Sequence, residues 1–197
     1  MPAGDIMPWI SPLGGTFELR YGSMTAAQAW LKGHPVGVID AGTVTQATND
    51  GVEYTLAEMD TVGNVCGIAA WSVGTDDGDG TTTAGNINPK TGVAYAAGDE
   101  VAFWPADQGN LFITANFHNA DGAAVVVPAQ DDVGEIYQIS SSVVAGVHGY
   151  GFGLEQTAGV VGTDVLAIVH DVLDTNQAPI RLTNLAGVYL VFEIKTK

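Results

Sequence analysis

Short runs of alternating apolar and polar residues, each closed by turn-forming residues, dominate this sequence. The densest examples lie between Gly98 and Ser140, where Gly, Asp, Asn and Pro separate four such runs. Successive side chains of a β-strand point to opposite faces, so this alternation predicts strands joined by turns in an antiparallel sheet. The four runs are Val101–Trp104, Leu111–Phe117, Ala123–Val127 and Val133–Ile139.

Further strands are predicted on both sides of this region. Val188–Lys195 alternates cleanly, and Val62–Val73 and His34–Thr48 carry shorter alternations. Thr163–Asp174 fits both a helical stripe and a β-branched strand, and we predict a strand because a strand follows it after a short turn. Frequent glycines interrupt Val143–Leu154, and since glycine weakens strands we expect an irregular, turn-rich segment there.

One short helix is predicted at Ser23–Lys32. Thr25 and Gln28 have capping-box spacing, alanines follow, and Gly33 ends the pattern. Thr55–Glu58 suggests a single helical turn. The predicted fold class is therefore all-β: a compact antiparallel β-barrel or sandwich-like body with one short helix.

An extended arm is predicted at residues 1–22, because three prolines fix the backbone and remove amide donors. The arm is apolar and needs a surface to lie on, either its own domain or a neighbouring subunit. No linker composition follows it, so residues 23–197 are expected to form a single β-rich domain. The apolar arm residues, which we take as candidate binding residues, are Ile6, Met7, Pro8, Trp9, Ile10 and Leu13.

The charge balance is strongly acidic, with 22 Asp and Glu against 6 Lys and Arg and a net charge of −16. Such a field repels phosphate backbones and anionic membranes, so neither nucleic acid nor a membrane is an expected partner. Colloidal solubility, a salty medium or a basic partner surface would each suit this charge.

The single cysteine, Cys66, excludes an intramolecular disulfide and lies in an apolar run, where we expect a buried thiol. The N-terminus has neither the basic nor the apolar region of a secretory signal, and no run has the length of a membrane-spanning helix. These features predict a protein made in a cytoplasm and kept there, or released without a signal peptide.

Metal binding is not predicted. Asp76, Asp77 and Asp79 lie among glycines, but their spacing fails the calcium-loop pattern and favours a solvated loop; whether this loop binds a cation stays open. The histidines show no ligand spacing and are expected in turns or at the surface. They are His34, His118, His148 and His170.

Catalytic signatures are also lacking, so no catalytic residue, cofactor or enzymatic activity is predicted. Ser140–Ser142 is expected to be a loop without the glycines of a nucleophile turn. Sequence spacing cannot establish whether carboxylates face one another as in glycosidases, and aromatic residues serve either core packing or a sugar-stacking platform. These candidates are Asp131, Asp132 and Glu135, and Trp104, Tyr150 and Phe152.

The order of features resembles the capsid decoration, or cement, and auxiliary head proteins of tailed bacteriophages, in which an N-terminal arm precedes a compact β body. The resemblance covers most of the chain at the level of pattern. It is carried by the G-x-x-V-x-V-x-D-A-G stretch Gly33–Gly42, by Gly98–Phe103, by Val133–Ile139, and by a closing hairpin from Val165–Val172 to Val188–Ile194.

This resemblance implies a non-enzymatic virion structural protein on the capsid exterior, assembled in the host cytoplasm. Its expected partners are the major capsid protein and further copies of itself, in a homotrimer that reinforces contacts between capsomers. A carbohydrate-binding or adhesin-like β module is the alternative, and a small hydrolase with a site assembled from distant residues is a third possibility.

Overall fold

The structure is a computed structural model of the chain. It describes residues 6–9, 17–24, 28–38, 54–58, 64–76, 82–107, 109–119, 124–142, 151–156, 166–182 and 185–195.

The chain forms two compact units. The inserted unit is Glu18–Pro105, and the split unit joins Met1–Phe17 to Ala106–Lys197. The sequence had suggested an arm over 1–22 and a single domain over 23–197. The observed boundaries differ because residues 20–22 pair within the barrel of the inserted unit, whereas residues 7–8 pair within the sheet of the split unit.

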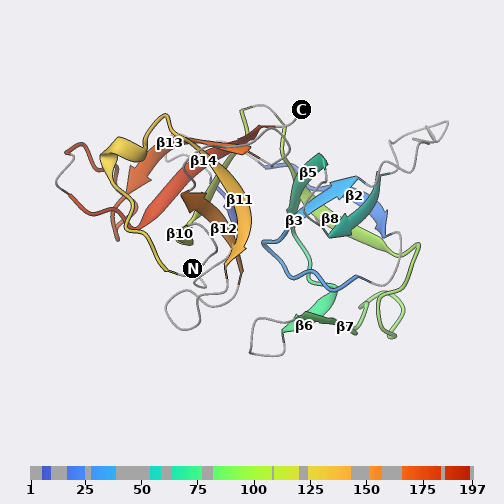
Figure 1. Ribbon diagram of the computed structural model, residues 1–197. Helices are drawn as coiled ribbons and strands as arrows, with labels where there is room; N and C mark the ends of the chain where they lie inside the picture. The colour runs from blue at the N-terminus through green and yellow to red at the C-terminus, as the bar shows by residue number, and fades with distance from the viewer. Residues whose placement is uncertain are drawn as a thin grey trace. The chain divides into compact units, whose positions relative to one another are not determined.

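Five strands of the inserted unit close into a barrel in the order β2-β4-β3-β5-β8 (Figure 1). β2 and β4 run parallel, and the other neighbouring pairs of this barrel run antiparallel. A hairpin of two further strands, β6 (Gly74–Asp76) and β7 (Thr82–Ala84), forms its own small sheet. The barrel strands are β2 (Arg20–Met24), β3 (Pro35–Val38), β4 (Tyr54–Glu58), β5 (Asn64–Ala69) and β8 (Glu100–Pro105).

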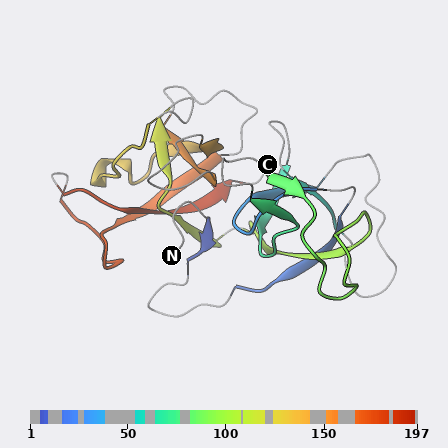
Figure 2. The same ribbon diagram turned by 90° about the horizontal axis from the view of Figure 1, so that it is seen from below.

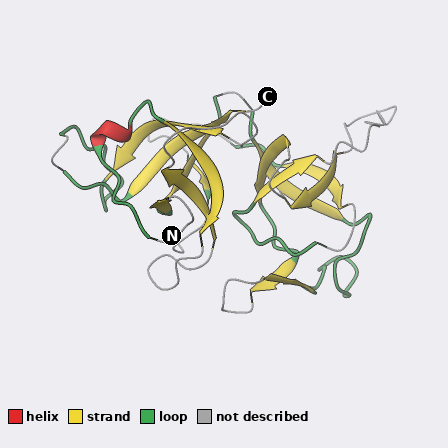
Figure 3. Ribbon diagram, viewed as in Figure 1, coloured by secondary structure: helices red, strands yellow, loops and turns green. Residues whose placement is uncertain are grey.

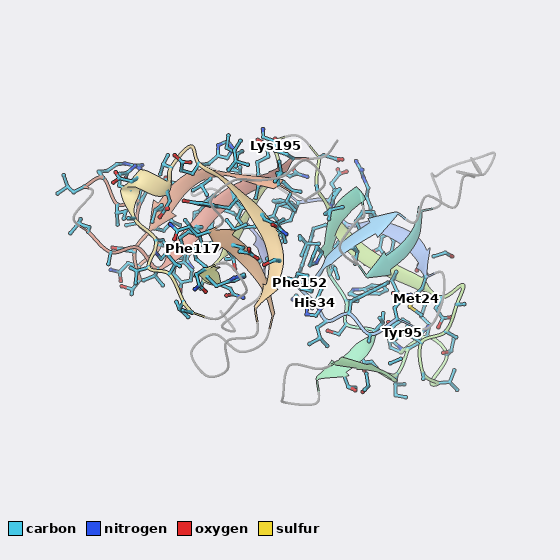
Figure 4. The ribbon with its side chains drawn as sticks, in the orientation of Figure 1. Met24, His34, Tyr95, Phe117, Phe152 and Lys195 are labelled. Atoms are coloured by element: carbon cyan, nitrogen blue, oxygen red, sulfur yellow. The ribbon has the colours of Figure 1, made fainter. Side chains whose placement is uncertain are left out.

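Large apolar side chains form the core of the inserted unit. Met24, Trp30 and Phe103 are almost completely buried and belong to one cluster, and Met24 and Tyr95 of this cluster are labelled in Figure 4. A Cβ on Gly67 would lie 2.2 Å from the carbonyl oxygen of Trp104, so only glycine permits this approach of β5 to β8. The remaining cluster members are Val36, Ala69, Val73 and Val101.

The split unit contains a seven-stranded sheet in the order β1-β9-β14-β13-β11-β12-β10, in which β13 and β14 run side by side (Figure 2). A 3₁₀ turn at Gln130–Asp132 is the only helical segment among the described residues (Figure 3). The strands are β1 (Met7–Pro8), β9 (Leu111–Thr114), β10 (Phe117–Asn119), β11 (Ile136–Ser142), β12 (Gly151–Gln156), β13 (Leu166–Leu173) and β14 (Tyr189–Lys195).

The central strand β14 is covered on both faces. Its residues Leu190–Ile194 are all buried, although consecutive side chains of a strand point to opposite sides. One buried side is fully apolar, with Phe192 beside Phe112 of β9 at a ring-centroid distance of 6.2 Å. The other includes a charged side chain, Glu193, which therefore needs partners.

The all-β prediction is confirmed, but the helix predicted at Ser23–Lys32 is wrong for its described residues. Ser23 and Met24 belong to β2, and residues 28–32 form no helix. The carbonyl oxygen of Trp30 accepts hydrogen bonds from the amides of Val73 and Gly74, both at 3.0 Å. The capping residues and alanines favour hydrogen bonds within a helix. In the structure, the backbone instead forms hydrogen bonds with segments distant in sequence.

Three further local predictions are corrected by strand pairing. Thr55–Glu58 is part of β4, which pairs with β2 and β3 and is not a helical turn. Ser140–Ser142 is the end of β11 and not a loop. In the segment expected to be irregular, residues 151–154 lie in β12, whereas 143–150 lie outside the described residues.

The ambiguous segment Thr163–Asp174 is a strand, as predicted, over Leu166–Leu173. It carries a β-bulge between Val169 and Asp171, so His170 has no residue directly opposite on β14. At the bulge, β13 has one residue more than the paired stretch of β14. The extra residue changes the alternation, so it determines which face of the sheet the side chains after the bulge occupy.

Candidate functional site

The N-terminal segment forms the outermost strand of the sheet in the split unit. Ile6 is completely buried, and the amide of Trp9 donates a hydrogen bond to the carbonyl oxygen of Leu111 at 2.8 Å. The segment is thus seated on the chain's own fold as an edge strand. β1 and β9 pair antiparallel, with Met7 opposite Ile113 and Pro8 opposite Phe112.

Met7 and Trp9 are half-buried because they cover an apolar cluster on this edge. The cluster consists of Ile113, Leu173 and Val191, each no more than 1% exposed. An edge strand with such a cluster beside it is a surface that pairs readily with another strand. β1 covers that surface in the structure.

The structure therefore locates four of the six arm residues proposed from the sequence. Ile6 through Trp9 lie in or beside β1, buried or half-buried. Ile10 and Leu13 lie outside the described residues.

A polar network crosses β10, β11 and β12, although its members lie far apart in sequence. The hydroxyl of Ser140 donates to Oε2 of Glu155 at 2.7 Å, and its oxygen lies 3.4 Å from Nε2 of His118. Nδ1 of the same histidine lies 3.1 Å from the carbonyl oxygen of Asn119, which can only accept, so Nδ1 is the donor. His118 is completely buried, in contrast to the predicted turn or surface position.

This network does not have the geometry of an activated nucleophile. The single hydrogen of Ser140 points to a carboxylate at the shorter distance and not to the imidazole. Nucleophilic activation requires the opposite, with the base accepting that hydrogen. The network therefore links side chains of three strands, and the Asn119 carbonyl satisfies Nδ1 of the buried His118.

A second polar cluster surrounds Glu193. Its Oε1 accepts the amide of Gly109 at 3.2 Å, and its Oε2 lies 3.2 Å from Nε2 of His170 and 3.7 Å from Nζ of Lys195. The hydrogen bond from Gly109 lowers the pKa of Glu193 below its ordinary value, and Lys195 and His170 act in the same direction. The cluster ties the turn before β9 to the sheet.

The three carboxylates considered as a glycosidase-like set do not form one. Asp132 is buried, and its oxygens accept hydrogen bonds from the amide of Ala129 at 2.7 Å and from the hydroxyl of Tyr137. Asp131 and Glu135 are exposed. Asp132 thus holds a turn, and both of its oxygens are engaged in doing so.

The aromatic residues considered as a sugar platform are distributed between the two units. Trp104 is half-buried in β8 of the inserted unit, with Nζ of Lys32 5.5 Å from its ring centroid. Phe152 is half-buried in β12 of the split unit. Tyr150 lies outside the described residues.

The remaining candidates add no site. Of the aspartate loop, only the backbone of Asp76 at the end of β6 is described, and Asp77 and Asp79 lie outside the description, as does His148. The backbone of Cys66 lies in β5, but its side chain is not described. Within the described part of the chain, no three His, Cys, Asp or Glu side chains gather as metal ligands, and no helix is long and apolar enough to cross a membrane.

Exposed aliphatic side chains on two loops of the split unit were missed by the sequence analysis. Val127 is 60% exposed, Leu182 59% and Leu185 45%. The amide of Gly187 donates to the carbonyl oxygen of Pro128 at 2.7 Å, which fastens one loop to the other. We call Val127, Leu182 and Leu185 the loop patch. Val127 lies in the run Ala123–Val127, for which the prediction of a strand is wrong over the described residues: Val125 forms an isolated bridge and residues 126–129 form a loop. The two leucines lie in a segment without strand alternation.

Comparison with known proteins yields no relative: no family model, curated protein or solved structure matches the chain.

Proposed function

We propose that this protein is a virion structural protein that binds the outer surface of an assembled phage capsid and reinforces contacts between capsomers. It acts as a decoration or cement protein. Its partners are the major capsid protein and further copies of itself, with which it forms a homotrimer. The observation that carries the proposal is the loop patch: three exposed aliphatic side chains on mutually fastened loops of an otherwise strongly acidic chain.

The loop patch suits such a role for an electrostatic reason. A net charge of −16 opposes docking onto any acidic surface, and this repulsion weakens as salt rises. Apolar contacts depend far less on salt and gain free energy with the area removed from water. A lattice also multiplies a weak contact, since each oligomer engages several equivalent sites.

Ile6 to Trp9 are not assigned to the capsid contact in this proposal. They are seated on β9, and reaching a capsid would require β1 to leave that edge. A truncation of residues 1–22 would also remove Arg20–Gly22 of β2, so point substitutions in the loop patch give a cleaner test.

The test is binding to expanded capsids that lack the protein, prepared from the phage that encodes it and measured by co-sedimentation. The chain carrying Val127→Asp and Leu182→Asp should lose binding while keeping the wild-type circular dichroism spectrum. The matched control carries Ile87→Asp and Val93→Asp, which replace two equally exposed aliphatic residues of the inserted unit with the same charge. This control should bind like the wild type.

Three outcomes would count against the proposal. Equal loss in both double variants would mean that added charge alone prevents binding. If the wild-type protein does not bind capsids but is retained by a glycan array, the result would favour a carbohydrate-binding module. If it turns over a substrate, the result would favour an enzyme.

A further inference from the structure

The N-terminal piece of the split unit, Met1–Phe17, is separated in sequence from the rest of its unit by the whole inserted unit. The chain leaves this piece at Phe17, forms the whole inserted unit, and returns only at Ala106. β1 therefore completes a sheet whose other six strands all belong to the later part of the chain.

The edge that β1 covers needs an occupant. Without β1, the carbonyl oxygen of Leu111 would lose its donor, and the side chains of Ile113 and Val191 would lose the cover of Met7 and Trp9. An unpaired strand edge flanked by apolar side chains recruits another strand. The structure shows which kind of strand fits this edge: an extended, apolar segment with the sequence of Ile6–Trp9.

The described contacts that hold the piece run from residues 7–9 and Phe17 to residues of 106–197. Pro8 has no amide hydrogen to donate, so the backbone pairing is sparse and side chains supply most of the attachment. At the far end of the piece, the ring of Phe17 packs edge-on against Phe112 with centroids 5.3 Å apart. None of these contacts requires that both partners belong to the same copy.

We infer that the β1 segment exchanges between copies, so that Ile6–Trp9 of one copy occupies the β9 edge of a second copy of this chain. Exchange of an identical element preserves every contact of the closed monomer, and its main cost is the entropy of association. A high local concentration, as among neighbouring copies in an assembly, lowers that cost. The inference stands apart from the proposed function, since it needs no capsid.

The experiment uses full-length chains in which Cys66→Ser removes the native thiol. Met7 and Ile113 face each other across β1 and β9, so Met7→Cys is placed in one chain and Ile113→Cys in another chain of different mass. The two are mixed, oxidised and resolved by mass. We expect a mixed disulfide dimer whose yield rises with concentration. One chain carrying both cysteines is the folding control and should form the bond within itself at low concentration.

The collision control pairs Met7→Cys with Val127→Cys, which is far more exposed than position 113. Exchange predicts at least about tenfold more mixed dimer with Ile113→Cys, because pairing fixes the two thiols at high effective concentration. A yield no greater than that of the collision control would overturn the inference.

Replacing the buried Ile113 removes core contacts of this edge, so the mixture is repeated with a milder variant. This variant carries Leu111→Cys, half-buried on the same strand, and is cross-linked to Met7→Cys with a short bismaleimide. Absence of mixed dimer there, with cross-linking in the corresponding chain carrying both cysteines, would also overturn it. Failure here would leave capsid binding untouched, since no capsid enters the experiment.

Discussion

Tyr137, the second residue of β11, donates its phenolic hydrogen to Oδ1 of Asp132 in the preceding 3₁₀ turn across 2.5 Å. The other carboxylate oxygen of Asp132 accepts the amide of Ala129 at 2.7 Å. The tyrosine ring also packs on Phe117 with centroids 5.0 Å apart. The carboxylate of Asp132 thus joins the turn to β11 through Tyr137, and the ring of Tyr137 packs on the core residue Phe117.

Replacing Tyr137 by phenylalanine should destabilise the protein by about 1–3 kcal/mol, the usual cost of leaving one buried polar group unsatisfied. The ring contact with Phe117 is kept, so the loss reports on the hydroxyl. Urea unfolding of wild type and variant measures the difference. Asp131→Asn, a change of an exposed carboxylate one residue away from Asp132, is the control and should fall within about 0.5 kcal/mol of wild type.

The same tyrosine predicts a loss of stability at alkaline pH. Burial, and next the hydrogen bond to Asp132, raise the pKa of Tyr137 above its ordinary value of 10.0. Below that value both folded and unfolded states hold the proton; above it only the folded state does, so stability falls as pH rises. Urea midpoints between pH 8 and pH 11 should therefore decline less steeply for Tyr137→Phe than for wild type. Parallel curves would show that Tyr137 does not contribute.

Glu193 predicts the opposite behaviour in acid. Its pKa is lowered, first by the amide of Gly109, so the stabilisation is present above the ordinary value of 4.5 and is lost as pH falls through the lowered one. Glu193→Gln should thus be less stable than wild type at pH 7, and the two should converge towards pH 3. Urea midpoints over this range measure the convergence. Glu135→Gln, at an exposed carboxylate, should show a pH profile parallel to that of wild type.

Ile6 tests the seat of the N-terminal segment. Because its side chain is completely buried, Ile6→Ala should cost about 2–4 kcal/mol, as for other large core truncations. Leu19→Ala, at a side chain 41% exposed near the start of the inserted unit, should change stability far less. Equal, small effects of the two substitutions on the free energy of unfolding would mean that the segment does not occupy the edge of β9.

Predictions from the sequence succeeded where the local pattern and the tertiary environment agree. The predicted run Val101–Trp104 lies within β8, and all of Val188–Lys195 except its first residue lies in β14. They failed at Ser23–Lys32, where capping residues and alanines favour a helix but the backbone pairs with distant strands. The same competition explains Thr55–Glu58, since no local signal reveals that β4 has neighbours on both sides.

The candidate site was less accessible to sequence reasoning. His118, Ser140 and Glu155 meet because β10, β11 and β12 are adjacent in the sheet, and nothing in their sequence spacing indicates this. The loop patch likewise depends on the hydrogen bond between Gly187 and Pro128, which joins loops far apart in the chain.

The sequence by itself determined the β class and the strongly negative net charge, because alternation, turn chemistry and charge are local properties. Only the tertiary structure decided that the chain divides into a barrel and a sheet, and that Ile6–Trp9 completes the latter as an edge strand. The physical reason is that strand pairing satisfies backbone groups without regard to distance along the chain, so which strands become neighbours is a property of the whole fold.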